Sequence, residues 1–320
     1  MSRDVRVIAR AKLTLSLRVL GLRPDGYHEL EALVVSISDP HDVVGLRIQA
    51  PFGVRVRLSG RAVVGVPVDE SNLAVRAARL LLEAAAEGED PGPWAASGLD
   101  ISLHKTIPAG AGLGGGSADA AGALVGGARL LGLPLDVDGL AALGARLGSD
   151  VPFCVAGGGA WMRGRGEVVE PLPALHALAR SADGSEPDDG RLALVVAVPP
   201  FGLSTPDVYR AWDDLGGPSS TRAVPTPAAL AGLGLPDELV NDLEPAAEHV
   251  EPRLRPFRES LEALAGGPAL LAGSGSAYVV AVGSAAQAAV VATQAGVELR
   301  ALAFASGLAA RGVEAQRSPD

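Results

Sequence analysis

A glycine-rich segment near the middle of the chain has the composition of an anion-binding loop. Residues 110–116 contain five glycines, and Ser117, Asp119 and three alanines follow directly. Glycine has no Cβ, so the backbone of such a loop can approach a ligand closely. Ser117 is a good N-cap for a following helix, whose N-terminus offers unpaired N–H groups and the positive end of its dipole. The segment therefore predicts a loop that binds an anion, most simply the phosphates of a nucleotide.

The spacing of these glycines leaves more than one interpretation open. Gly110, Gly112 and Gly115 fit the G-x-G-x-x-G pattern of dinucleotide-binding oxidoreductases, and Asp136 stands near the distance expected of the acid that binds the ribose. That pattern follows a continuously apolar strand, whereas residues 99–105 alternate between apolar and polar side chains, which is typical of a half-exposed antiparallel strand. The lysine of a GxxxxGK[ST] P-loop is also absent from its place. An NAD(H)-dependent oxidoreductase and a glycine loop without a ligand stay as alternatives to a phosphate loop of another kind.

Other side chains with chemical use are scattered along the chain. Lys12 falls on the polar side of an alternating strand, and a Pro-Asp-Gly turn delivers Tyr27 and His28 side by side. Asp150 follows a short helix, and a second glycine loop occupies residues 273–277. On local grounds each side chain is at least as readily structural, for example a solvated lysine or a turn aspartate.

The elements that would position these residues follow from hydrophobic spacing and turn signals. The helix after the glycine loop is built of small residues and should pack closely against its neighbours. Ser204 or Thr205 is expected to cap a helix that carries Tyr209. The remaining expectations are a strand over 5–20, a hairpin of strands 43–50 and 54–59, helices over 72–86, 117–131 and 298–311, a buried strand over 192–198 and an acidic loop over 181–190.

Composition excludes several classes of protein. The 320 residues are 48% hydrophobic but only 3% aromatic, so the core must consist of Ala, Val and Leu. A net charge of −10 argues against nucleic acid or an anionic membrane as the main partner. The single cysteine, Cys154, lies in an apolar run and is expected to be a buried, inert thiol. No long apolar segment is present, so we expect a cytoplasmic protein.

Three separate stretches together resemble the motifs of the GHMP kinases. They are Ala11-Lys12, residues 108–121 and residues 271–277, in the family's order. Residues 23–30 and 147–153 further resemble those members that act on 4-diphosphocytidyl-2-C-methyl-D-erythritol. The resemblance spans about residues 5–310 and implies an α+β fold of two domains, with the active site in the cleft between them. The domains would be an N-terminal ATP-binding domain, 1–168, and a C-terminal α+β domain, 169–320.

The resemblance also implies a reaction and its catalytic residues. The γ-phosphate of ATP would pass, with Mg²⁺, to the 2-hydroxyl of that substrate in the non-mevalonate isoprenoid precursor pathway. Asp150 matches the residue that takes the hydroxyl proton, and Lys12 matches its partner, which steadies developing negative charge. The residues that match the ATP site are Asn72, Lys105, Pro108, Ala109, Gly110, Ala111, Gly112, Leu113, Gly114, Gly115, Gly116, Ser117 and Gly275.

The implied substrate site consists of Thr14, Tyr27, His28, Asp150 and Tyr209. Tyr27 and Tyr209 match the aromatic pair that sandwiches the cytosine ring, and His28 would read the edge of that ring. Ser117 is the candidate ligand for Mg²⁺.

The chain departs from the family pattern at three positions. Thr14 stands where the family has asparagine, Ala118 where it has a second serine, and Tyr209 where phenylalanine is common. The expected partners are a small-molecule substrate and no nucleic acid or membrane, for a monomer or weak homodimer. Another GHMP-family small-alcohol kinase and a non-catalytic ligand-binding protein of this fold are the alternatives.

Overall fold

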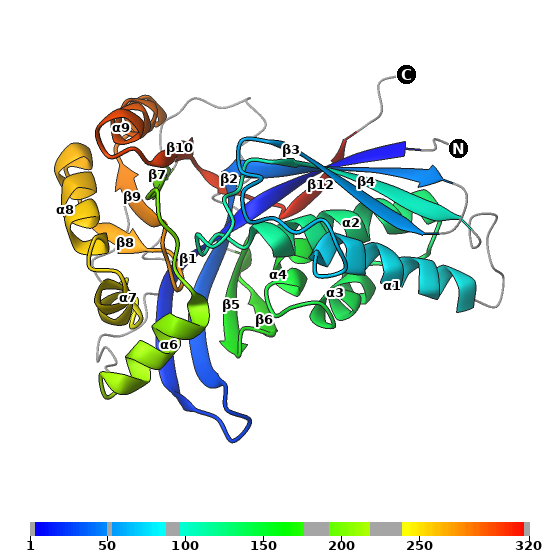
Figure 1. The fold of residues 1–320 in the computed structure, drawn as a ribbon, viewed down its shortest axis with the longest axis horizontal. Helices are drawn as coiled ribbons and strands as arrows, with labels where there is room; N and C mark the ends of the chain where they lie inside the picture. Colours follow the sequence, from blue (N-terminus) through cyan, green and yellow to red (C-terminus); the bar gives the residue numbers. More distant parts are fainter. Residues whose placement is uncertain are drawn as a thin grey trace.

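The protein was analysed as a computed structural model that describes residues 4–49, 53–87, 97–173, 175, 192–217 and 239–316. It contains two β-sheets, and helices pack on each of them. The two sheets lie beside one another in Figure 1. The expected acidic loop over 181–190 falls outside the described residues. None of the helices in the described ranges is long and apolar enough to cross a membrane.

The larger sheet is built on two long antiparallel strands. These are β1 (Asp4–Leu22) and β2 (His28–Gln49), and β12 (Val313–Gln316) pairs with β1 on its other edge. Side chains alternate across a strand, so the apolar residues of β1, from Val5 to Leu17, reach the core while Lys12 faces the other side. The expected strand over 5–20 is therefore confirmed.

The predicted hairpin of 43–50 with 54–59 is wrong. β4 (Gly98–Lys105) lies between the two segments, antiparallel to β2 and parallel to β3 (Val54–Gly60). Parallel neighbours need a crossover, and here α1 (Leu73–Glu87) supplies it between β3 and β4. The alternation predicted for β4 is present, because Leu99, Ile101 and Leu103 are buried.

The first half of β2 carries a second set of partners. β5 (Gly159–Gly164) pairs with residues 30–35, β6 (Val168–Pro171) pairs with β5, and β11 (Leu308–Ala309) pairs with Ser36 and Ile37.

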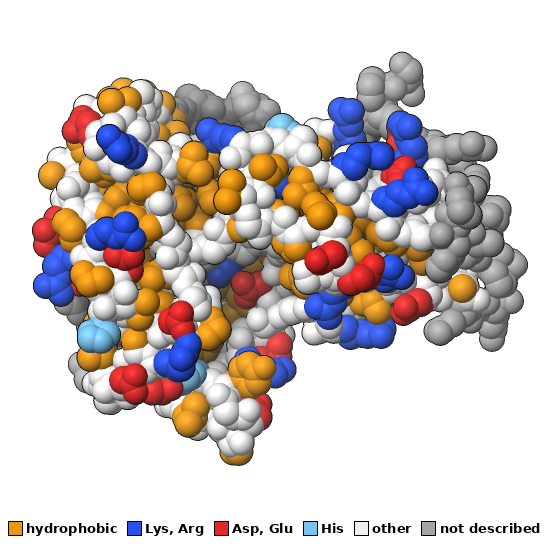
Figure 2. All heavy atoms as spheres, in the orientation of Figure 1, with side chains coloured by type: hydrophobic (Ala, Val, Ile, Leu, Met, Phe, Trp, Pro, Cys, Tyr) orange, Lys and Arg blue, Asp and Glu red, His pale blue; other side chains and the backbone are white. Residues whose placement is uncertain are grey.

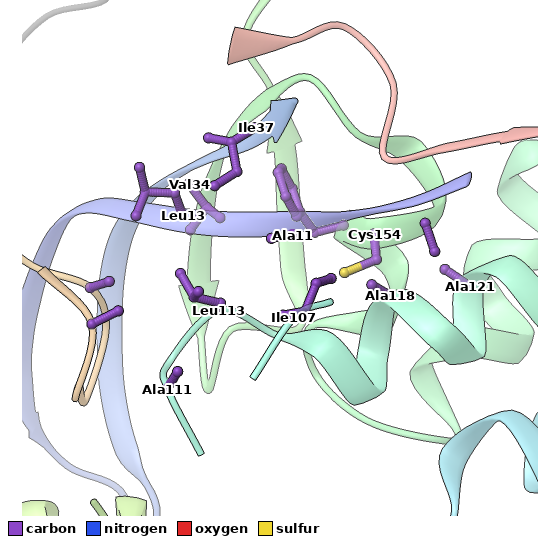
Figure 3. Packing of buried hydrophobic residues seen from close by; sticks show 14 of the residues in the cluster. Ala11, Leu13, Val34, Ile37, Ile107, Ala111, Leu113, Ala118, Ala121 and Cys154 are labelled. Atoms are coloured by element: carbon purple, nitrogen blue, oxygen red, sulfur yellow. The ribbon is translucent and has the colours of Figure 1, made fainter. Parts of the chain in front are cut away.

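Helix α2 (Gly115–Leu131) packs on β1 and β2 almost entirely out of solvent. A Cβ on Gly122 would lie 2.8 Å from a Val44 methyl group, so only glycine permits this close approach. The close packing expected of this small-residue helix is confirmed. α3 (Val137–Ala145) and α4 (Val151–Ala156) follow it, and Figure 3 shows Cys154 of α4 between β1 and Ala118 of α2.

The smaller sheet has the strand order β10-β7-β9-β8. Its strands are β7 (Ala193–Val198), β8 (Ala269–Leu271), β9 (Tyr278–Val282) and β10 (Leu302–Ser306). In the described part of the chain, α8 (Leu254–Ala265) and α9 (Ala285–Glu298) contact this sheet, α7 (Glu244–Val250) contacts α8, and α6 (Thr205–Asp214) contacts α7. Every residue of β7 is buried, as predicted.

The helix predicted over 298–311 is wrong. α9 ends at Glu298, and residues 302–306 and 308–309 are strands that pair with β7 and β2. The open edge of the buried strand β7 needs hydrogen-bond partners, and this requirement outweighs the local helical preference.

Candidate active site

A cleft of about 640 Å³ gathers the polar residues that the sequence singled out. Figure 2 shows a hollow in this face of the molecule, with a basic and an acidic side chain inside it. The lining includes every expected substrate and catalytic residue: Lys12, Thr14, Tyr27, His28, Asp150 and Tyr209. They come from β1, the turn into β2, the residue before α4, and α6, so elements far apart in sequence converge here.

Lys12 and Asp150 face one another in this cleft. Lys12 Nζ lies 3.6 Å from Asp150 Oδ2, with 12% and 32% of the two side chains exposed. Lys12 Nζ also donates a hydrogen bond to Thr14 Oγ1 at 3.3 Å. A partly desolvated ammonium next to a carboxylate places a positive charge and a proton acceptor within reach of the same bound group.

Cys154 takes no part in this chemistry. Its thiol is buried, and burial together with the nearby charge of Asp150 raises its pKa, which disfavours the reactive thiolate. The expectation of a buried, inert thiol is confirmed.

The two glycine loops meet backbone to backbone beside Lys12. Ala277 N donates to Ala111 O at 3.1 Å, and a Cβ on Gly112 would lie 2.2 Å from Ala272 O. Lys12 N donates to Leu113 O, and a Cβ on Gly114 would lie 2.7 Å from Lys12 Cγ. The buried side chain of Leu113 lies below Leu13 of β1 in Figure 3, so it anchors the loop from inside. The result is a backbone-lined wall directly against the Lys12 side chain.

The start of α2 differs from the expectation. The N-cap is Gly114, with φ +67° and no side-chain hydrogen bond, and the helix begins at Gly115. Ser117 therefore lies within the first turn and caps nothing. Gly114 can take up the left-handed conformation that non-glycine residues avoid, so the chain enters the helix three residues earlier. Ser204, in contrast, is the N-cap residue of α6, as expected, although its side chain makes no capping hydrogen bond.

A smaller pocket of about 150 Å³ lies beside the start of α2. Its lining includes Asn72, Lys105, Ala109, Gly115 and Gly116 of the expected ATP-binding residues. Gly112 and Gly114 line the larger cleft instead. The other expected ATP-binding residues line neither cavity: Pro108, Gly110, Ala111, Leu113, Ser117 and Gly275.

Asn72 and Lys105 both have partners within the protein. Asn72 is buried just before α1, where its Oδ1 accepts from Ala74 N and its Nδ2 donates to Pro67 O. Lys105 is 2% exposed and forms ion pairs with Asp42 and Asp119. Burial alone would lower the pKa of Lys105, but the charges of these carboxylates outweigh it and raise the pKa.

The Asp42 carboxylate also fixes the backbone just before the glycine loop by hydrogen bonds. Its Oδ1 accepts from Thr106 N and Ile107 N at 2.5 and 3.0 Å. Burial raises the pKa of Asp119 to about 8: the Lys105 ammonium opposes this shift, and the nearby charge of Asp42 adds to it. The three side chains thus form a buried cluster between the sheet and α2.

The expected base-binding residues lie at one end of the larger cleft. His28 stacks on Tyr209 with ring centroids 4.8 Å apart, contacts Trp212 edge-on, and its Nε2 lies 2.9 Å from Asp213 Oδ1. The Arg165 guanidinium lies 4.9 Å from the centre of the Tyr27 ring. The aromatic groups are therefore gathered, with His28 and Arg165 against ring faces that a base could occupy.

Sequence reasoning missed several residues that hold or line the site, among them five that are charged or carry an amide. They are Asp42, Asp119, Arg165, Asp213 and Asn241. Asp42 carries no local signal, because its partners come from β4 and α2. The only cue for Asp119 would have been a charged residue at a position of α2 where the spacing of the small and apolar residues predicts a buried side chain.

Comparison with known proteins identifies the family. Residues 72–158 match the model of the GHMP kinases N terminal domain. A 4-diphosphocytidyl-2-C-methyl-D-erythritol kinase of Cutibacterium acnes is 38% identical over 279 residues, which cover 85% of this chain and 83% of that protein. One of Salinispora arenicola is 39% identical and covers 90% and 86% of the two chains. The chain belongs to the 4-diphosphocytidyl-2-C-methyl-D-erythritol kinase family. It is therefore an ATP-dependent kinase, as the motifs implied.

Solved structures agree with this family assignment. A crystal structure of a 4-(cytidine 5'-diphospho)-2C-methyl-D-erythritol kinase is 34% identical, with a TM-score of 0.69 over 95% of this chain and 99% of that one. A homoserine kinase from Cytophaga hutchinsonii has a TM-score of 0.68 at 19% identity, covering 99% and 98%, and shares the fold alone. The α+β GHMP kinase fold expected from the sequence is confirmed, whereas the NAD(H)-dependent alternative finds no support in the family.

Proposed function

We propose that the chain transfers the γ-phosphoryl group of ATP to the 2-hydroxyl of 4-diphosphocytidyl-2-C-methyl-D-erythritol. The observation that carries the proposal is the Lys12–Asp150 pair, 3.6 Å apart beside the two joined glycine loops. The family membership supplies the substrate, since its members are named for that compound.

In this mechanism Asp150 takes the proton of the acceptor hydroxyl. Lys12 stabilises the negative charge that develops on the hydroxyl oxygen and on the phosphoryl group in transit. The backbone N–H groups of the first glycine loop and the start of α2 hold the phosphates of ATP. Phosphoryl transfer depends mainly on positioning and electrostatics, so these few groups are sufficient.

Mg²⁺ is the implied metal, and the residues at hand fit a weakly protein-bound ion. Within the described ranges, no three His, Cys, Asp or Glu side chains are arranged to hold a metal ion. Mg²⁺ characteristically keeps water and phosphate ligands and takes only one or two from protein. Ser117, half-buried in the first turn of α2, would supply a hydroxyl ligand. The bound ion would neutralise charge on the β- and γ-phosphates.

The cytidine end of the substrate would lie against Tyr27, His28 and Tyr209. Tyr27 is 56% exposed, so its ring is open to a base, and His28 is fixed beside Tyr209. Stacking would hold the plane of the base, and His28 would contact its hydrogen-bonding edge. Thr14 accepts a hydrogen bond from Lys12 and lines the same cleft, so it would contact the methylerythritol portion.

Three further predictions complete the proposal. We keep the division into domains 1–168 and 169–320, with the qualification that β11 and β12 pair with strands of the first. The single buried cysteine supports a cytoplasmic location. We also expect the partner to be a small-molecule substrate and not a nucleic acid, and the protein to be a monomer or weak homodimer.

The decisive experiment incubates the protein with ATP, Mg²⁺ and the diphosphocytidyl alcohol, and detects the phosphorylated product by mass spectrometry. We expect product from wild type, and a fall in kcat of about 100-fold or more in Asp150→Asn with binding of ATP retained. Asp138→Asn, the same substitution at an exposed site in α3, should behave as wild type. Product from homoserine or mevalonate alone would instead support another small-alcohol kinase.

A further inference from the structure

Asn241 is a buried side chain that joins the second glycine loop to the rest of the cleft. It is 8% exposed and lies in the short segment before α7. Its Nδ2 donates to Leu271 O at 2.9 Å and to Gly273 O at 2.7 Å, and its Oδ1 accepts from Leu243 N at 3.0 Å. Both N–H groups and the carbonyl oxygen of the amide are therefore occupied.

The segment that carries Asn241 is fixed to β1 from the other side. Leu17 N donates to Val240 O, Asp242 N donates to Leu17 O, and Ser16 Oγ donates to Val240 O. Leu17 and Asn241 also form an isolated parallel bridge. Residues 240–242 thus act as a strap (defined here by these bonds) between β1 and the loop that follows β8.

The strap joins β1 to the loop that follows β8, and both of these segments carry groups of the proposed active site. β1 carries Lys12 and Thr14, and the loop carries Gly273, which lines the cleft. A Cβ built on Gly273 would lie 3.6 Å from Lys12 Nζ and 3.6 Å from Thr14 Oγ1. The bond from Asn241 to Gly273 O therefore holds a residue of the loop that lies close to the ammonium group.

We propose that Asn241 is a positioning residue that sets the distance between the second glycine loop and Lys12, and thereby the width of the phosphate site. The inference rests on the proposed phosphoryl transfer. A shift of the loop by a fraction of an ångström would change how the phosphates and the Lys12 ammonium meet, which affects ATP more than the cytidine end.

The chemistry of the amide makes the proposal testable by an almost isosteric change. In Asn241→Asp, a carboxylate oxygen that can only accept would face the carbonyl oxygens of Leu271 and Gly273. Both hydrogen bonds would be replaced by repulsion, and the loop would move away. We expect the KM for ATP to rise about ten-fold and kcat to fall, with the KM for the diphosphocytidyl alcohol within about two-fold of wild type.

Ser16→Ala is the matched control. It removes one part-buried hydrogen bond on the β1 side of the same strap, where the two backbone bonds between Leu17 and the strap remain, and it does not touch the loop. It should lower the melting temperature and leave the KM for ATP unchanged. If Asn241→Asp does not fold, Asn241→Ala is measured by the thermal shift that a non-hydrolysable ATP analogue produces, and a shift smaller than in Ser16→Ala is expected.

Equal KM values for ATP in Asn241→Asp and Ser16→Ala would overturn the inference, as would a parallel rise in both KM values. An equal shift by the ATP analogue in Asn241→Ala and Ser16→Ala would do the same. A wild-type protein that phosphorylates nothing would instead contradict the proposed function, so the two failures can be told apart.

Discussion

Replacement of Gly112 by alanine tests whether the contact between the two glycine loops builds the phosphate site. Gly112 has a φ of +77°, and its added Cβ would lie 2.2 Å from Ala272 O and 3.1 Å from Gly275 O. Both atoms belong to the backbone of the second loop, so no flexible side chain can turn away. The methyl group can be accommodated only if the loops separate.

Two contributions set the size of the effect of Gly112→Ala: the backbone strain of alanine at a positive φ, and the clash of its Cβ with the second loop. Alanine at a positive φ costs roughly 1–2 kcal/mol in backbone strain. In addition, real Cβ contacts are essentially never below 3.0 Å, so the loops must separate by at least 0.8 Å at this point. A misplacement of about 1 Å can lower a rate by about 100-fold, and we expect a fall of that order in kcat/KM for ATP.

Gly110→Ala separates strain from steric clash. Gly110 has nearly the same φ, +70°, but the nearest atom to its added Cβ is Leu203 O at 4.0 Å. The two variants therefore share the conformational strain, and only Gly112→Ala pushes the loops apart. We expect Gly110→Ala to retain kcat/KM within about ten-fold of wild type.

Steady-state kinetics with varied ATP, together with urea unfolding of both variants, measures the two terms. A loss of stability in both variants, together with a much larger loss of kcat/KM in Gly112→Ala, would support the reasoning. Equal kinetic losses in the two variants would refute it, because the contact with Ala272 would then have no part in catalysis.

Two further predictions concern the charges missed from the sequence. The Asp213 carboxylate can only accept a hydrogen bond, so it holds the hydrogen of His28 on Nε2 and leaves Nδ1 for a ligand. Asp213→Asn should therefore lower the preference for a cytidine over a uridine substrate by about five-fold in kcat/KM. The neighbouring substitution Asp214→Asn should leave this preference unchanged. The pKa of Asp119, raised to about 8, means that the folded state binds a proton that the unfolded state releases above about pH 4. The free energy of unfolding should therefore fall as the pH rises toward 8, by at most about 1.4 kcal/mol per unit, and urea titrations at pH 6 and 8 should find this contribution absent from Asp119→Asn.

Local patterns were sufficient for most single elements of this fold. Alternation predicted β1, and apolar spacing predicted α1, whose bounds are Leu73–Glu87. Small residues predicted the tight packing of α2. These features depend on neighbours in sequence or on one buried face, which a sequence pattern records directly.

Pairing between distant segments was the part that local patterns missed. β3 looked like the hairpin partner of β2, yet it pairs with β4 through the crossover of α1. β10 looked helical because nothing near residue 302 reveals that the open edge of β7 needs a partner. The strand–helix–strand order of β3, α1 and β4 was visible, and it would have favoured the parallel arrangement.

The site itself shows why a motif locates chemistry more readily than it explains it. The glycines at 110–116 identify a phosphate loop, but their spacing is set by contacts with segments far along the chain. Gly112 is small because Ala272 O lies against it, and Gly114 is small because the Lys12 side chain does. Neither reason can be read from the loop alone. Each motif of this chain thus supplies only one side of a contact. Asn241, which makes hydrogen bonds to the second loop, lies outside all three motifs.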